Sequence, residues 1–269
     1  MTATKVAFTD VKWTMLVTLH MRAMDSRQAE PVLGDRFAAE AERRIDYDFG
    51  SWRMRVTEGD RHLVTLRAKR LDTWAAEFLA AHPDAVVAHL GCGLDSRWLR
   101  LAPPPTVSWF DVDLPEVVAL RRELYGDAEG YRMIASSVTD PGWVEHLPTG
   151  RPLLVIAEGL LMYLTAPHVA GLLSRLTTRA PAGQVLFDAI APWVVPTSAM
   201  LSPLLGAFRM RWALSDVREV ERWGLRHRDT ETLLGHHERV PSTLVRSVYG
   251  VFARVPPVRD ALRAFRFDF

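Results

Sequence analysis

Two motifs near the middle of the chain combine residue types that bind nucleosides. An apolar run over residues 85–90 ends on Gly91, Cys92 and Gly93, and a second apolar run ends on Asp113, which lies 20 residues beyond Gly93. Glycines after a strand let the backbone turn sharply and admit a ligand close to the main chain. A carboxylate at the next strand end can accept hydrogen bonds from both hydroxyls of a ribose. This spacing therefore predicts a nucleoside site.

Each motif also has a simpler interpretation. A glycine turn of this kind suits any tight connection between a strand and a helix, and Asp113 precedes Leu114 and Pro115, where a helix N-cap is expected. The third glycine of the dinucleotide fingerprint is absent, because Trp98 and its neighbours occupy that position. This absence disfavours a ligand with a pyrophosphate, so a nicotinamide-dependent oxidoreductase is the least favoured alternative.

Two later strand ends also carry candidate binding residues. Glu158 follows an apolar run over residues 152–157, and a carboxylate there is costly unless a polar or cationic group meets it. A sulfonium or ammonium group of a ligand would meet it, and so would one of the many arginines. Ser137 and Val138 follow the strand-like residues 131–136 and suit either the edge of an adenine or a plain turn.

Taken in order, these motifs resemble the leucine carboxyl methyltransferase superfamily, and they fit its bacterial branch, the tetracenomycin-type polyketide carboxyl O-methyltransferases. The resemblance is strong over roughly residues 15–190 and looser beyond. The runs that carry it are residues 18–27, 46–49, 90–97, 110–115 and 157–163. Three motifs in the right order are specific for the superfamily, but they do not specify a substrate.

The resemblance implies S-adenosylmethionine (SAM) as cofactor. By resemblance, Arg67 matches the arginine on the methionine carboxylate, Asp113 the ribose acid and Glu158 the acid near the methionine amino group. Tyr163 would lie on the substrate side as the candidate catalytic residue. The full set of predicted cofactor-binding residues is Arg67, Gly91, Cys92, Gly93, Asp113, Ser137, Val138 and Glu158.

The chain departs from the protein-methylating branch at two of these places. That branch has an aspartate where Ser137 stands, at the adenine contact. It also uses an N-terminal lysine on the SAM carboxylate, for which Arg22 rather than Lys12 is the candidate substitute.

These residues need a scaffold, and the hydrophobic periodicity predicts one. Residues 1–82 are helical in pattern and are expected to form a cap within the same domain. Residues 83–269 alternate strands with helices, which predicts a Rossmann-like class I SAM methyltransferase core: a mostly parallel sheet with helices on both faces. Within it, residues 191–212 either form a lid or substrate wall or simply pack on the core. Residues 224–229 and 246–252 are expected as final strands.

Composition and charge narrow the partners, bound metals and compartment that we expect for this α/β protein. The 269 residues carry a formal net charge of +1, which gives no reason to expect nucleic acid or a membrane as partner. The single cysteine excludes an internal disulfide framework, and the histidine spacing predicts no metal site. With no apolar run of signal or membrane-spanning length, we expect a cytoplasmic monomer or homodimer that acts on a small molecule.

The predicted reaction is methyl transfer to an oxygen nucleophile, most simply a carboxylate of a polyketide-type metabolite. A carboxylate is ionised at pH 7 and needs no strong base. A phenol or other hydroxyl acceptor is the alternative; it would favour a nearby base such as His20, His89 or His168. A non-catalytic SAM-binding module is the alternative from another class.

Overall fold

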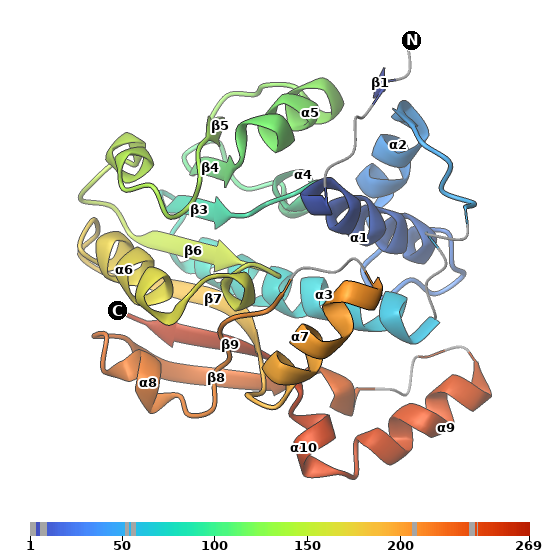
Figure 1. Ribbon diagram of the computed structural model, residues 1–269. Helices are drawn as coiled ribbons and strands as arrows, with labels where there is room; N and C mark the ends of the chain where they lie inside the picture. Colours follow the sequence, from blue (N-terminus) through green and yellow to red (C-terminus); the bar gives the residue numbers. More distant parts are fainter. Residues whose placement is uncertain are drawn as a thin grey trace.

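The computed structural model describes the chain apart from residues 1–3, 6–9, 52–53, 55–57, 206–208, 237–239 and 241. Its centre is a seven-stranded sheet in the order β5-β4-β3-β6-β7-β9-β8 (Figure 1). Every neighbouring pair from β5 to β7 is parallel, and β9 runs antiparallel to both β7 and β8. The strands are β3 (Val86–Leu90), β4 (Ser108–Asp113), β5 (Tyr131–Ala135), β6 (Leu153–Ala157), β7 (Gly183–Ile190), β8 (Arg226–Thr232) and β9 (Leu262–Asp268).

The predicted arrangement of helices on both faces of a mostly parallel sheet is confirmed. One face packs against α3 (Glu58–Ala81), together with α4 (Arg97–Leu101) and α5 (Pro115–Tyr125). The other face packs against α6 (Ala166–Thr177), α8 (Arg218–Glu221) and the 3-10 helix η2 (Gly142–His146). Central strands such as β3 and β6 are buried along their whole length, which explains why their sequences are apolar except for His89.

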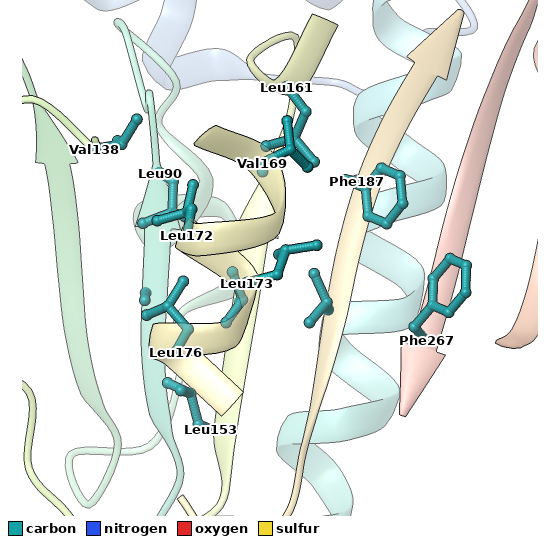
Figure 2. Packing of buried hydrophobic residues seen from close by; sticks show 14 of the residues in the cluster. Leu90, Val138, Leu153, Leu161, Val169, Leu172, Leu173, Leu176, Phe187 and Phe267 are labelled. Atoms are coloured by element: carbon teal, nitrogen blue, oxygen red, sulfur yellow. The ribbon is translucent and has the colours of Figure 1, made fainter. Parts of the chain in front are cut away.

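The face covered by α6 shows how the helix pattern builds the core. Val169, Leu172, Leu173 and Leu176 recur at helical spacing and are all fully buried. Figure 2 shows them over the central strands, in the same cluster as Leu90 of β3 and Phe187 of β7. Phe187 stacks on Phe265 and Phe267 of β9, with ring centroids 5.4 and 5.6 Å apart.

The N-terminal region packs beside the ends of the strands. Helices α1 (Asp10–Ser26) and α2 (Arg36–Arg44) form a third apolar cluster with α5 and Leu94, the residue after the glycine turn. The structure adds a feature that the helical pattern did not predict. A two-residue parallel pair joins β1 (Thr4–Lys5) to β2 (Ile45–Asp46), too short to produce a visible alternation in the sequence.

The C-terminal predictions need correction. The expected strand over residues 246–252 is wrong, because this segment lies in helix α9 (Thr243–Phe252), where Ser242 caps the start by accepting a hydrogen bond from Val245 N–H. The expected strand at 224–229 is β8, shifted to Arg226–Thr232. Strand β9 was not predicted at all. The remaining elements are α7 (Val194–Leu205), α10 (Pro256–Arg259) and the 3-10 helices η3 (Leu161–Tyr163) and η4 (Leu233–Gly235).

Two further properties concern the described residues only. No helix among them combines the length and the apolar character that a membrane span requires. No group of three or more His, Cys, Asp or Glu side chains in the same part of the chain is arranged to hold a metal ion.

Candidate cofactor-binding and active site

The predicted residues lie at the point where the strand order reverses. Strand β3 has β4 on one side and β6 on the other, so the connections leaving β3 and β6 diverge at their carboxyl ends. Ligands of open parallel sheets bind outside the carboxyl ends of the strands at such a switch point. The Gly91–Gly93 turn follows β3, Asp113 ends β4 and Glu158 follows β6, so all three face this one edge.

The glycine turn has a backbone that only glycine adopts readily. Gly91 and Gly93 have φ angles of +56° and +51°, in the left-handed region. A Cβ on Gly91 would lie 2.8 Å from Leu160 Cδ1, so the turn after β3 lies directly against the turn after β6. Cys92 between the glycines is buried, and burial raises the pKa of its thiol, which keeps it protonated.

A buried arginine that sequence reasoning missed holds this turn in place. Arg121 on α5 donates to the backbone carbonyls of Gly93 at 2.8 Å and Asp95 at 2.9 Å. The same guanidinium pairs with Asp111, which also accepts from His89 Nδ1 at 3.0 Å. Residues 110–115 were noted as a motif, but nothing in the pattern indicated that Asp111 would hold Arg121.

Asp113 lies where the ribose acid is predicted and is bound to the glycine turn. Its carboxylate accepts the backbone N–H of Gly93 at 2.7 Å and that of Leu114 at 2.7 Å. The N-cap residue of α5 is Leu114, so Asp113 does not cap the helix in the usual way. Burial raises the pKa of Asp113, although the two backbone hydrogen bonds act against that effect.

The two predicted adenine contacts have different surroundings. Ser137 is half-buried after β5, and its Oγ lies 2.8 Å from Thr139 Oγ1. Val138 is buried in the core on the α6 face. Their contact with an adenine stays a prediction.

Arg67 and Glu158 meet directly. Arg67 on α3 donates from Nε to Glu158 Oε1 at 3.2 Å, and Arg97 on α4 pairs with the other carboxylate oxygen. Burial would raise the pKa of Glu158, but Arg67 and Arg97 lower it to about 2, so the group is ionised at neutral pH. Of the two interpretations of Glu158, the arginine salt bridge is therefore present, and contact with a cofactor ammonium stays a prediction.

Asp188, two residues before the end of β7, is an additional carboxylate that sequence reasoning did not select. It is fully buried and accepts from Arg67 Nη1 at 3.1 Å. Tyr163, the predicted substrate-side residue, lies on η3, within electrostatic reach of both Arg67 and Asp188. Burial raises the pKa of Tyr163, and the charge of Arg67 offsets only part of this effect. The raised pKa favours the neutral phenol.

Arg22, the candidate substitute for the N-terminal lysine, pairs with Asp95, two residues after the glycine turn. It is buried on α1 with Nη1 3.2 Å from Asp95 Oδ1. Asp95 also meets Arg100, at 2.7 Å, and Arg100 continues to Asp35 at 2.8 Å. This chain of ion pairs connects the N-terminal helices with the turn after β3.

Two of the three histidines considered as bases have other partners, whereas His168 is exposed. His89 is buried and bonded to Asp111 and Arg97 beneath the turn. His20 pairs with Glu42 between α1 and α2. His168 lies on α6, the helix that covers one face of the sheet. None of these observations brings an imidazole to the edge where Asp113 and Glu158 lie.

The donor and acceptor groups fit SAM better than a dinucleotide. The edge offers a carboxylate for ribose hydroxyls, a guanidinium for a carboxylate, and a second carboxylate for an ammonium. Counted from Gly91, the third glycine position of the dinucleotide fingerprint is Ser96 rather than Trp98, and Ser96 Oγ donates to Asp35 Oδ1 at 2.6 Å.

Comparison with known proteins agrees with this geometry. A profile of the Leucine carboxyl methyltransferase family matches residues 15–177. The chain is 44% identical to the tetracenomycin polyketide synthesis O-methyltransferase TcmP of Streptomyces glaucescens, over 98% of each chain. It is 33% identical to the S-adenosyl-L-methionine-dependent methyltransferase dpfgK of Gibberella zeae, over 88% of this chain and 87% of that one.

Among solved structures, a DUF574 family protein from Streptomyces avermitilis superposes with a TM-score of 0.59. The match covers 94% of this chain and 96% of that one at 12% sequence identity, so it bears on the fold alone.

Proposed function

Because the chain belongs to the leucine carboxyl methyltransferase family, we propose that it transfers the methyl group of SAM to a carboxylate oxygen of a polyketide-type small molecule. The observation that carries this proposal is the meeting of Asp113, the Gly91–Gly93 turn and the Arg67–Glu158 pair at one edge of the sheet. The name of the Streptomyces glaucescens relative supports a polyketide as the acceptor class.

Each of these residues binds a different part of the cofactor. Asp113 accepts hydrogen bonds from the ribose hydroxyls. The turn of Gly91, Cys92 and Gly93 lets the nucleoside approach the main chain. Arg67 pairs with the methionine carboxylate, and Glu158 attracts the ammonium group. Ser137 and Val138 border the adenine.

Catalysis rests on position rather than on proton transfer. When bound, SAM supplies a methyl group on a cationic sulfur, and an acceptor carboxylate is already ionised at pH 7. The chain's own residues then need to hold the two reactants in line and exclude water. Such positioning is worth up to about 7–11 kcal/mol in well-oriented reactions.

The engagement of His20 and His89 favours a carboxylate over a phenol. A phenol of pKa about 10 needs a base to ionise it, but His89 and His20 are tied to Asp111 and Glu42. Tyr163 is not a base either, because burial raises its pKa. We place Tyr163 on the acceptor side of the site.

We propose that residues 1–82 and the segment 191–212 act as cap and acceptor wall around this site. In the described part of 191–212, Trp193 and Met200 are exposed on and beside α7, whereas Trp212 is buried in the core. Residues 206–208 of this segment lie outside the described residues.

One acceptor that carries both groups tests the choice of oxygen. An anthraquinone with one carboxyl group and phenolic hydroxyls, incubated with the protein and SAM, should gain one methyl group as an ester. Mild alkali releases the methyl group of an ester as methanol and leaves an aryl ether intact. A product that survives alkali would contradict carboxyl methylation, and binding of the acceptor and SAM without any product would indicate a non-catalytic module.

A further inference from the structure

Asp188 uses its two carboxylate oxygens for two different parts of the site. Oδ1 accepts the backbone N–H of Gly159 at 2.6 Å, and Oδ2 accepts from Arg67 Nη1 at 3.1 Å. The side chain is fully buried on β7, two residues before Ile190 ends the strand. One buried carboxylate therefore joins α3, which carries Arg67, to the turn after β6.

The sheet register explains why this carboxylate lies beside Glu158. Ala157 of β6 pairs with Phe187 of β7, so Glu158 and Asp188 are the next residues on adjacent parallel strands. Two buried carboxylates side by side repel each other unless a cation lies between them. Arg67 is that cation, with 3.1 Å from Nη2 to Glu158 Oε1 and 3.1 Å from Nη1 to Asp188 Oδ2.

Gly159 makes the contact between turn and guanidinium tight. Its φ angle is +62°, and a Cβ built on it would lie 3.4 Å from Arg67 Nη2. The backbone of the turn thus packs against the guanidinium on one side and donates to Asp188 from its N–H group. The same turn leads into η3, which carries Tyr163.

We propose that Asp188 is a positioning residue that orients the Arg67 guanidinium for the methionine carboxylate of SAM and fixes the Gly159 turn relative to it. This inference rests on the proposed function, in which Arg67 binds that carboxylate. Asp188 then acts through Arg67 on the cofactor side and through the Gly159 turn on the acceptor side.

The geometry leaves Arg67 able to bind a ligand while Asp188 holds it. A guanidinium carries five N–H donors, and its hydrogen bonds to Glu158 and Asp188 use two of them. A guanidinium fixed in advance loses less side-chain freedom when it grips a carboxylate. The benefit of Asp188 is therefore confined to ligands that carry the amino-acid part of the cofactor.

This confinement gives a selective test with two ligands. S-adenosylhomocysteine carries the carboxylate, whereas 5′-methylthioadenosine has the same nucleoside and thioether without it. Asp188→Asn keeps the size of the side chain and removes its charge. Calorimetric titration should show S-adenosylhomocysteine bound roughly tenfold more weakly and methylthioadenosine unchanged to within about twofold.

A double-mutant cycle of Arg67 and Asp188 distinguishes a failure of this inference from a failure of the proposed function. Arg67→Ala should show the same selective loss, and Arg67→Ala with Asp188→Asn should bind S-adenosylhomocysteine no more weakly than Arg67→Ala alone. The exposed Asp229 of β8 provides a matched control, Asp229→Asn, which should behave as the wild type.

Equal weakening of both ligands by Asp188→Asn, or no weakening of either, would overturn the positioning role. If Arg67→Ala itself leaves the ratio of the two affinities unchanged, Arg67 does not bind the carboxylate and the proposed function needs another cation. Melting without ligand checks the fold of each variant. Should Asp188→Asn not fold, Asp188→Glu keeps the charge but displaces the carboxylate, and a wild-type affinity ratio in it would contradict the inference equally.

Discussion

At the scale of single residues, Asp113 illustrates how one side chain shapes a site and serves it. Its carboxylate accepts two backbone N–H groups, from Gly93 and Leu114, which holds the glycine turn against the end of β4. A carboxylate offers about four lone-pair positions, so the two backbone bonds leave capacity for ribose hydroxyls. The structural role and the binding role are thus compatible in the same group.

Replacing Asp113 separates these two roles. We expect Asp113→Ala to weaken binding of S-adenosylhomocysteine by roughly 1.5–3 kcal/mol, because hydrogen bonds to a charged group have that magnitude. Calorimetry measures the affinity, and a melting curve without ligand measures the effect on the turn. Asp127→Ala, on the exposed segment after α5, is the control. Unchanged affinity together with a large drop in melting temperature would mean that Asp113 only supports the turn.

The sequence predicts which residues follow strands, but it does not predict their partners. Asp113 and Glu158 were selected because each ends an apolar run, and both lie at the predicted edge. Arg67 meets Glu158 across 91 residues of sequence and Asp188 across 121. Pairings at such distances depend on strand order, which local patterns do not contain. Asp188 carries a similar signal to Glu158, an acid near the end of a buried strand, and was overlooked.

At the scale of elements, periodicity was informative where strands are buried on both faces. Strands β3 and β6 are mostly apolar runs and were expected within one or two residues of their observed bounds. Strand β9 was missed because arginines interrupt it: Arg266 is buried and pairs with Glu77 on α3, which satisfies its charge. Helix α9 contains three valines, a residue type that favours strands, but its cap and its contacts with α3 and η4 favour a helix.

The elements before the sheet are joined to it by buried charge. Arg100 on α4 donates hydrogen bonds to Asp35 before α2, to Asp72 on α3 and to Asp95 just after the glycine turn. Arg22 brings α1 to the same Asp95. A network of this kind is strong only while every member is ionised and paired. The position of the N-terminal helices over the turn therefore depends on the charge state of these carboxylates.

At the scale of the whole molecule, this dependence sets the response to acid. Arg121 and His89 outweigh the effect of burial and lower the pKa of Asp111 to about 2, and arginines lower the pKa of Glu158 to about 2 and that of Asp95 well below its usual range. A carboxylate whose pKa is lower in the folded than in the unfolded chain stabilises the fold at pH values above its pKa in the unfolded chain. That stability is lost as the pH falls from about 5 toward 2. Asp113 and Asp188, whose pKa values burial raises, offset part of the loss.

We therefore expect the free energy of unfolding to fall by at least about 2 kcal/mol between pH 5 and pH 3. Urea unfolding at several pH values, followed by tryptophan fluorescence, measures it. The same titration in 0.5 M salt should give a similar slope, because screening acts weakly on buried pairs. A free energy that stays constant over this range would show that these carboxylates are not ionised and paired in the folded protein.

The central claim is that the edge formed by the Gly91–Gly93 turn, Asp113 and the Arg67–Glu158 pair is a SAM site. Calorimetric titration of the wild-type protein tests it most directly, with S-adenosylhomocysteine and NAD as the two ligands. We expect S-adenosylhomocysteine to bind with a dissociation constant of about micromolar, or roughly −8 kcal/mol, and NAD to give no heat. Binding of NAD with comparable affinity, or the absence of binding by S-adenosylhomocysteine, would contradict the account.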